Sequence, residues 1–167
     1  MGATDRSGSE PRSANRRALS YIDRSRQFYA AHGYTTPYEW AVHDDAPFAR
    51  PTTPVAEARV AVVTTAFPLD SSRPKQVLAR SIDPVPHEMF TDDLSWHKEA
   101  THTDDVDSFL PLDALARARE QGAIAEIGPR FYCLPTVYSQ RQSTVSGHQI
   151  AEWCREDSVD MVVLVPI

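Results

Sequence analysis

Two short apolar runs interrupt an otherwise mixed pattern of hydrophobic and polar residues. Residues 59–67 read Arg-Val-Ala-Val-Val-Thr-Thr-Ala-Phe, and residues 160–167 read Asp-Met-Val-Val-Leu-Val-Pro-Ile. Short continuous runs rich in β-branched side chains are typical of strands that are buried on both faces of a sheet. The pattern therefore predicts one buried strand in each run, with the second strand at the end of the chain.

Apolar residues at helical spacing predict three helices. The first spans residues 16–32 and ends before Gly33, and its apolar stripe is expected to pack on the rest of the fold. The second spans residues 112–121 and ends before Gly122. The third spans residues 146–157 and opens with the Ser-x-x-Gln form of a capping box.

The remaining segments are polar and rich in proline. Residues 68–108 show no clear periodicity, apart from a short strand expected around residues 85–90, and so long a stretch is usually functional when it is ordered. Another short strand is expected over residues 131–137, at a sheet edge because Pro135 cannot donate a ladder hydrogen bond. The alternation of strands and helices predicts an α/β fold with a Rossmann-like, open, mostly parallel sheet and flanking helices, incomplete at the C-terminus.

Composition narrows the class of protein. The 167 residues suffice for a single α/β domain, expected over residues 16–167, after a polar, disordered tail over residues 1–15. A net charge of −6 argues against nucleic acid and anionic membranes as partners, and no apolar run approaches the roughly 20 residues that span a bilayer. Cys133 and Cys154 are too few for a disulfide framework, are interpreted as buried small hydrophobes, and favour a cytoplasmic location.

The densest group of chemically active side chains lies in residues 96–107, Trp-His-Lys-Glu-Ala-Thr-His-Thr-Asp-Asp-Val-Asp. His97 and His102 could act in proton transfer, oriented by Asp104 or Asp105, and the same four side chains could bind a divalent metal. The two histidines stand five residues apart, which fits neither one helix face nor a standard ligand motif, so no metal is assigned. A solvated polar loop is the third interpretation.

Arginine and aromatic residues form a second group. Arg130 with Tyr132 and Tyr138 would suit a ligand that carries a carboxylate, because guanidinium binds a carboxylate through two parallel hydrogen bonds. In the alternative interpretation, Arg130 pairs with an acidic side chain of the chain itself and the tyrosines only pack.

Three motifs together resemble one known family. They are Trp96-His97 followed by Thr-His-Thr-Asp-Asp at 101–105, Gly-Pro-Arg-Phe-Tyr at 128–132, and Val-Asp at 159–160 leading into Val-Leu-Val-Pro. On these motifs the chain resembles selenoprotein B of the glycine/betaine/sarcosine/D-proline reductase family over most of residues 18–167. The domain would then be the N-terminal part of a longer family domain.

The resemblance implies a component of an oxidoreductase that cleaves a C–N bond reductively and uses a dithiol, oxidised to a disulfide, as electron donor. In this family a strand ending in Val-Pro-(Leu/Ile) runs into a selenocysteine or cysteine, which is the nucleophile. Here that residue is expected after Ile167, at an in-frame UGA codon read as a stop. The chain alone is therefore expected to be inactive and to carry no cofactor, with selenocysteine beyond its C-terminus.

The resemblance also implies roles for individual residues and for partners. Proton transfer would fall to His97 and His102. The expected partners are other reductase components, a thioredoxin-type dithiol donor, a small amino-acid or betaine substrate, and further copies of the chain in an oligomer. Substrate binding, including contact of the aspartates with a cationic amine, would fall to a second set of side chains: Asp104, Asp105, Arg130, Tyr132 and Tyr138.

Two alternatives from other classes stay open. One is a metal-dependent enzyme built on His97, His102, Asp104 and Asp105, which stoichiometric metal in the purified protein would favour. The other is a non-catalytic subunit whose terminal strand is completed by a partner chain, which a stable hetero-oligomer would favour.

Overall fold

The structure, a computed structural model, forms two compact units, Met1–Asp44 and Asp45–Ile167, and each is described by itself. The expected tail over residues 1–15 lies outside the described residues. So do His97 and Tyr138 of the predicted site. The structure describes residues 20–36, 41–42, 44–45, 49–71, 76–92, 94, 99–137 and 139–167.

The first unit contains helix α1, Tyr21–Ala31. Its N-terminus is capped by Ser20, whose hydroxyl accepts a hydrogen bond from the backbone N–H of Asp23 over 3.3 Å. Gly33 follows the helix with a φ of 82°, a conformation that glycine adopts without steric cost, and this confirms the predicted end of the helix. The expected packing of the apolar stripe on the rest of the fold stays a prediction.

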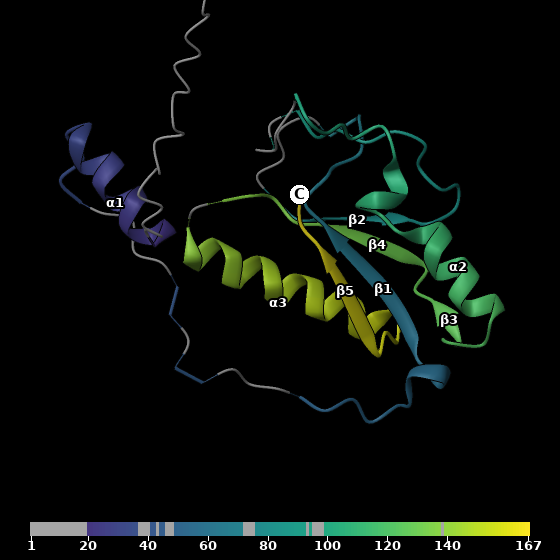
Figure 1. The fold of residues 1–167 in the computed structure, drawn as a ribbon. Coiled ribbons are helices and arrows are strands. Elements are labelled where there is room, and N and C mark those ends of the chain that lie inside the picture. The colour runs from purple at the N-terminus through teal and green to yellow at the C-terminus, as the bar shows by residue number, and fades with distance from the viewer. Residues whose placement is uncertain are drawn as a thin grey trace, which may run out of the picture. The chain divides into compact units, whose positions relative to one another are not determined.

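The second unit is built on a five-stranded, mostly parallel sheet, which confirms the predicted α/β class (Figure 1). β1 pairs in parallel with β3, β4 and β5, and β2 pairs antiparallel with β4. Two short 3₁₀ helices, η1 (Val55–Glu57) and η2 (Val106–Ser108), precede β1 and α2. The strands are β1 (Arg59–Thr64), β2 (Leu78–Ser81), β3 (Glu126–Ile127), β4 (Arg130–Cys133) and β5 (Met161–Val165).

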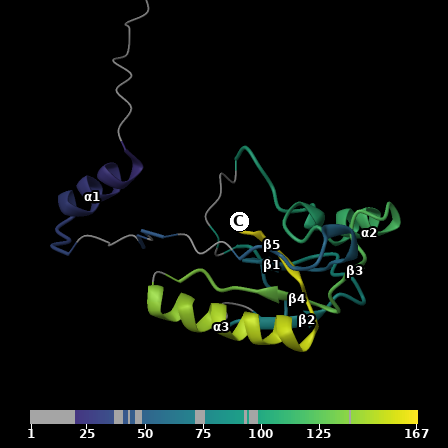
Figure 2. The same ribbon diagram turned by 90° about the horizontal axis from the view of Figure 1, so that it is seen from below.

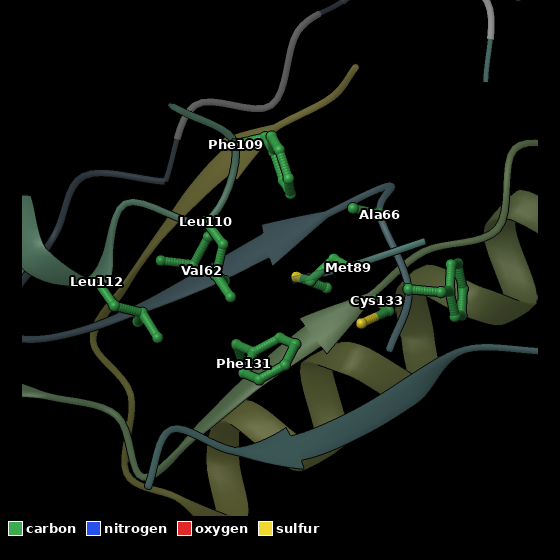
Figure 3. Close-up of a cluster of buried hydrophobic side chains, with 9 residues drawn as sticks. Val62, Ala66, Met89, Phe109, Leu110, Leu112, Phe131 and Cys133 are labelled. Atoms are coloured by element: carbon green, nitrogen blue, oxygen red, sulfur yellow. The ribbon is translucent and has the colours of Figure 1, made fainter. Parts of the chain in front are cut away.

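Two helices cover the two faces of this sheet (Figure 2). On one face, α2 (Leu112–Glu120) closes the core cluster drawn in Figure 3, in which Val62 of β1 and Phe131 of β4 pack together. On the other face, α3 (Gln140–Glu156) packs Ile150 against the alternate side chains of β1. The alternation of β1 between two apolar layers explains why its sequence is a continuous apolar run.

β5 lies at an edge of the sheet and its central side chains are exposed. The prediction that it is buried on both faces is therefore wrong. β5 pairs with β1 from Val60 to Thr64, and β3 and β4 pair with residues at the two ends of the same stretch. A strand has two edges, so β3 and β4 share one edge of β1 and β5 takes the other. Val162, Val163 and Leu164 are accordingly 37%, 38% and 71% exposed.

Other predicted boundaries also need correction. α3 begins at Gln140 rather than at residue 146, because the earlier Ser-x-x-Gln at residues 139–142 forms the cap, with the hydroxyl of Ser139 accepting from the N–H of Gln142. β4 ends before Pro135 and lies between β2 and β1, so it is not an edge strand. Instead of a strand over residues 85–90, the structure has an isolated β-bridge between Phe67 and Phe90.

Candidate functional site

The parallel strands β1, β4 and β5 end at one edge of the sheet, which is where ligands bind in open α/β folds. Several loops gather beyond this edge, around the C-terminus of the chain (Figure 1). They include the Thr-His-Thr-Asp-Asp segment, residues 101–105, which borders a cavity together with Pro166 and Ile167. The motif singled out in the sequence thus lies against the end of β5.

A hydroxyl fixes the end of β5. Thr65 directly follows β1 and is largely buried. Its Oγ1 accepts a hydrogen bond from the backbone N–H of Ile167 over 2.9 Å and lies 3.4 Å from the carbonyl oxygen of the same residue. Two strands that are far apart in sequence are thereby joined at their carboxyl ends.

A second hydroxyl pair fixes the Thr-His-Thr-Asp-Asp segment. The Oγ1 atoms of Thr91 and Thr103 lie 2.8 Å apart, and Thr91 is 4% exposed. Thr91 itself follows the bridge in which Phe67 donates to Phe90 over 3.1 Å. The segment is therefore attached to the extension of β1 through a short series of hydrogen bonds.

Two cavities adjoin this segment. The first, the terminal cavity, has a volume of about 230 Å³ and is lined by residues that include His102, Ser108, Phe109 and Ile167. The second, the acidic cavity, has a volume of about 220 Å³ and is lined by residues that include Glu88, Asp92 and Asp104. Thr103 lines both cavities, so they are neighbours.

His102 and Asp104 are the predicted site residues that face these cavities. His102 Nδ1 lies 3.6 Å from Asp104 Oδ2, and the two side chains are 72% and 90% exposed. That distance is longer than a hydrogen bond, and solvent screens an exposed ion pair strongly. Both side chains are thus accessible to a small molecule.

Asp105, predicted to bind substrate, and its neighbour Asp107 serve the local fold. The Oδ1 of Asp105 accepts from the N–H of Asp107 over 3.2 Å and so caps η2. The Oδ1 of Asp107 accepts from the N–H groups of Asp113 and Ala114 over 2.8 and 3.4 Å, in the first turn of α2. Asp107 replaces the side-chain cap that Pro111 cannot supply.

Arg130 forms ion pairs with acidic side chains at the end of α3, which agrees with the alternative interpretation that it pairs within the chain. Its Nε and Nη2 donate to the two carboxylate oxygens of Asp157 over 2.7 and 2.9 Å, and Nη2 also donates to Glu156 over 2.9 Å. These bonds hold the pKa of Asp157 below its usual range and raise that of Arg130. The guanidinium is bound within the chain.

Tyr132 belongs to the same network. It is fully buried, and its hydroxyl donates to Asp157 over 2.8 Å. Burial, together with this hydrogen bond, raises the pKa of Tyr132 well above its usual value. Because Asp157 directly follows α3 and precedes β5, the network lies toward the amino ends of the strands. The structure therefore brings His102 and Asp104 together and places Arg130 and Tyr132 apart from them.

Both cysteines are buried, as expected from the sequence. Burial raises the pKa of Cys133 to about 12 and also raises the pKa of Cys154. A thiol attacks only as its thiolate, so neither residue is suited to act as a nucleophile at neutral pH. Among the residues that the structure describes, no three His, Cys, Asp or Glu side chains lie close enough together to hold a metal ion.

Sequence reasoning missed the polar residues that assemble the site. Thr65 carries a signal, since it is one of two threonines at the end of an otherwise apolar run. Thr91, Glu88 and Asp92 lie in the proline-rich stretch, where no local pattern distinguishes them. None of the helices in the described part of the chain is long and apolar enough to cross a bilayer.

Comparison with known protein families identifies a family to which the chain is similar. The family model of glycine/sarcosine/betaine reductase selenoprotein B matches residues 10–166. No curated protein and no solved structure matches the chain. The matched range includes both cavities and the strands that position them, apart from Ile167 itself.

Proposed function

The chain belongs to the glycine/sarcosine/betaine reductase selenoprotein B family, and we propose that it is the component of such a reductase that holds the substrate. The reaction is the reductive cleavage of the C–N bond of a small amino acid or betaine. The two electrons come from a dithiol, which is oxidised to a disulfide. A thioredoxin-type protein and other reductase components are the proposed partners, and two free, buried cysteines suit a reducing cytoplasm.

The observation that carries the proposal is the position of His102 beside Ile167. Both line the terminal cavity, whose volume of about 230 Å³ suits a molecule of few heavy atoms rather than a drug-sized ligand. Because Thr65 fixes the backbone of Ile167, a residue that follows Ile167 would also be held at this cavity. That is the position proposed for the selenocysteine or cysteine nucleophile.

His102 is the proposed proton donor. When the C–N bond of glycine or sarcosine breaks, a neutral amine nitrogen must take up a proton as it leaves, and an imidazolium can supply that proton. Asp104, whose Oδ2 lies 3.6 Å from the ring of His102, can contact a cationic amine. His97, which lies outside the described residues, stays a second candidate for proton transfer, and Tyr138 stays a candidate for substrate binding.

The geometry favours a revised role for the other predicted substrate ligands. Arg130 and Tyr132 stabilise the end of α3 through Asp157, and Asp105 caps η2. Glu88, Asp92 and Asp104 border the acidic cavity, which adjoins the terminal cavity at Thr103. The proposal therefore rests on His102 and Asp104 for the chemistry near the substrate nitrogen.

The test is to read the DNA after the Ile167 codon and to express the protein with selenocysteine inserted if the codon is UGA. With the partner components and a dithiol, this protein should release ammonia, methylamine or trimethylamine from glycine, sarcosine or betaine, and D-proline is the further substrate to try. His102→Gln should lower the rate at least tenfold, whereas His148→Gln, on the exposed side of α3, should not. No amine release from glycine, sarcosine or betaine, together with no ring opening of D-proline to an open-chain amino acid, would refute the proposal.

The non-catalytic alternative is favoured by one observation: no other strand in the described part of the chain pairs with the outer edge of β5. A stable complex with a second polypeptide, together with amine release that does not depend on His102, would support it. The metal-dependent alternative needs His97, which lies outside the described residues.

A further inference from the structure

A short extension of β1, residues 65–67, makes contacts with two segments that lie far away in the sequence. Thr65 accepts the hydrogen bond from the backbone N–H of Ile167 over 2.9 Å. Two residues later, Phe67 and Phe90 exchange both backbone hydrogen bonds, over 3.1 and 2.6 Å. Ala66 and Phe67 are buried in the core cluster of Figure 3, so close packing holds this extension in one place.

Thr91 links this extension to the segment that carries His102. It directly follows Phe90, is buried, and its carbonyl oxygen accepts a hydrogen bond from the N–H of Leu94 over 3.0 Å. Its Oγ1 lies 2.8 Å from the Oγ1 of Thr103, and we call these two groups the hydroxyl pair. A buried hydroxyl that loses its partner costs free energy, so the hydroxyl pair resists separation.

The position of His102 is set by its backbone rather than by packing of its ring. The imidazole is largely exposed, and residues 101–105 belong to no helix or strand. Adjacent Cα atoms lie about 3.8 Å apart, so a fixed Thr103 restricts the backbone of His102 to a small region. On the other side the segment runs into η2, whose Val106 packs against the core cluster. The imidazole therefore projects from a short stretch of backbone that is held at Thr103 and at Val106.

We propose that Thr91 and Thr103 are positioning residues for the imidazole of His102. Their hydroxyl pair sets the place of that ring relative to the backbone of Ile167. Two parts of the lining of the terminal cavity are then held by the same extension of β1, Ile167 through Thr65 and His102 through the hydroxyl pair. The inference rests on the proposed function, in which His102 donates the proton and the nucleophile follows Ile167.

The proposed chemistry needs these two groups at a fixed separation. The selenolate or thiolate forms a bond to the substrate carbon, the electron pair of the C–N bond passes to the nitrogen, and the nitrogen takes the proton of the imidazolium. The two groups thus act on adjacent atoms of one small molecule. A displacement of about 1 Å can lower the rate of such a step by about two orders of magnitude. Loss of the hydroxyl pair should therefore affect the chemical step more than substrate binding.

Four variants separate positioning from general stability. Thr91→Val removes one hydroxyl and nearly keeps the shape of the side chain, whereas Thr91→Ser keeps the hydroxyl. Thr103→Val removes the other half of the hydroxyl pair, so it should have the same effect as Thr91→Val, and the two effects should not add. Tyr132→Phe is the matched control, because it also removes the hydrogen-bonded hydroxyl of a buried side chain, toward the amino ends of the strands and away from His102.

The first measurement is nuclear magnetic resonance relaxation of the backbone amide of His102 in the full chain, residues 1–167. The order parameter of the wild-type chain should be near the value of about 0.85 that is typical of rigid backbone, and it should fall below about 0.6 in Thr91→Val and Thr103→Val. Thr91→Ser and Tyr132→Phe should keep the wild-type value. A wild-type value already below about 0.6, no fall in Thr91→Val, or an equal fall in Tyr132→Phe would overturn the inference.

The second measurement uses the protein that carries the residue after Ile167, together with its partner components. Thr91→Val should lower kcat for amine release about tenfold or more and leave KM within about twofold, and Thr91→Ser should restore kcat. An unchanged kcat in Thr91→Val would overturn the positioning role. If the wild-type protein releases no amine, the proposed function fails, whereas the relaxation measurement still decides whether the hydroxyl pair positions His102.

Discussion

The hydroxyl of Thr65 accepts a hydrogen bond from the backbone N–H of Ile167 over 2.9 Å. This contact joins the carboxyl ends of β1 and β5 beside the cavity that His102 borders. It gives the end of β5 a defined position relative to the imidazole. The proposed chemistry needs such a fixed distance, because positioning a reacting group makes a large contribution to rate.

Replacing Thr65 by valine should release the end of β5. Valine has nearly the same shape but cannot accept the hydrogen bond, so stability should fall by about 1 kcal/mol. The amide of Ile167 should exchange its hydrogen faster in deuterium-exchange experiments. Thr65→Ser keeps the hydroxyl and is the control, and equal exchange in both variants would show that the hydroxyl does not hold Ile167.

Removing the carboxylate of Asp107 should destabilise α2. Asp107→Ala leaves the first turn of the helix without its cap, which typically costs about 1 kcal/mol. Asp104→Ala, only three residues away and 90% exposed, should leave the urea midpoint nearly unchanged. Equal losses of stability in Asp107→Ala and Asp104→Ala would contradict the assignment of Asp107 as the cap of α2 and of Asp104 as a residue that only faces the cavity.

The pH dependence of stability should report the ion pair between Asp157 and Arg130. Arg130 holds the pKa of Asp157 below its unfolded value of about 3.9. The stabilisation is therefore present above that value and is lost as the pH falls through the lower, folded-state pKa. Urea unfolding from about pH 7 to about pH 2 should show this loss, and Asp157→Asn should be less stable at neutral pH with a flatter acid limb. Parallel profiles for both proteins would contradict this assignment.

The hydroxyl of Tyr132 should contribute to stability through the same carboxylate. Tyr132→Phe keeps the buried ring but removes a hydrogen bond to a charged acceptor, so a loss of about 1.5–3 kcal/mol is expected. The effects of Tyr132→Phe and Asp157→Asn should not add, because the two side chains form one contact. Additive losses in a double-mutant cycle would indicate that they act independently.

Local patterns predicted the parts of the fold that depend on neighbouring residues. The apolar run of β1, the helix that becomes α2 and the glycine that ends α1 each follow from a few adjacent positions. The start of α3 was misplaced because Ser-x-x-Gln occurs at residues 139–142 and again at 146–149. Only tertiary packing, which buries Ser146 inside the helix, distinguishes the two.

Long-range pairing accounts for the remaining differences. β2 reads Leu-Ala-Arg-Ser and has no strong strand pattern, so it depends on its antiparallel pairing with β4. β5 has the sequence of a fully buried strand, and periodicity cannot show that, among the described residues, only β1 pairs with it. The same distinction between local pattern and long-range contact applies to the candidate site. The segment with His102 and Asp104 could be found from its composition. Its position beside Ile167 and the hydrogen bond from Arg130 to Asp157 could be seen only in the folded structure.

The most direct measurement of the central claim is a nuclear magnetic resonance titration of the histidine rings in the full chain with glycine, sarcosine and betaine. If the terminal cavity holds the substrate beside Ile167, the ring signals of His102 should shift and saturate with at least one of these compounds. The signals of His148, exposed on α3, should not move. The shift should weaken in Asp104→Ala. Unchanged His102 signals at saturating concentrations of all three compounds would contradict the proposed site.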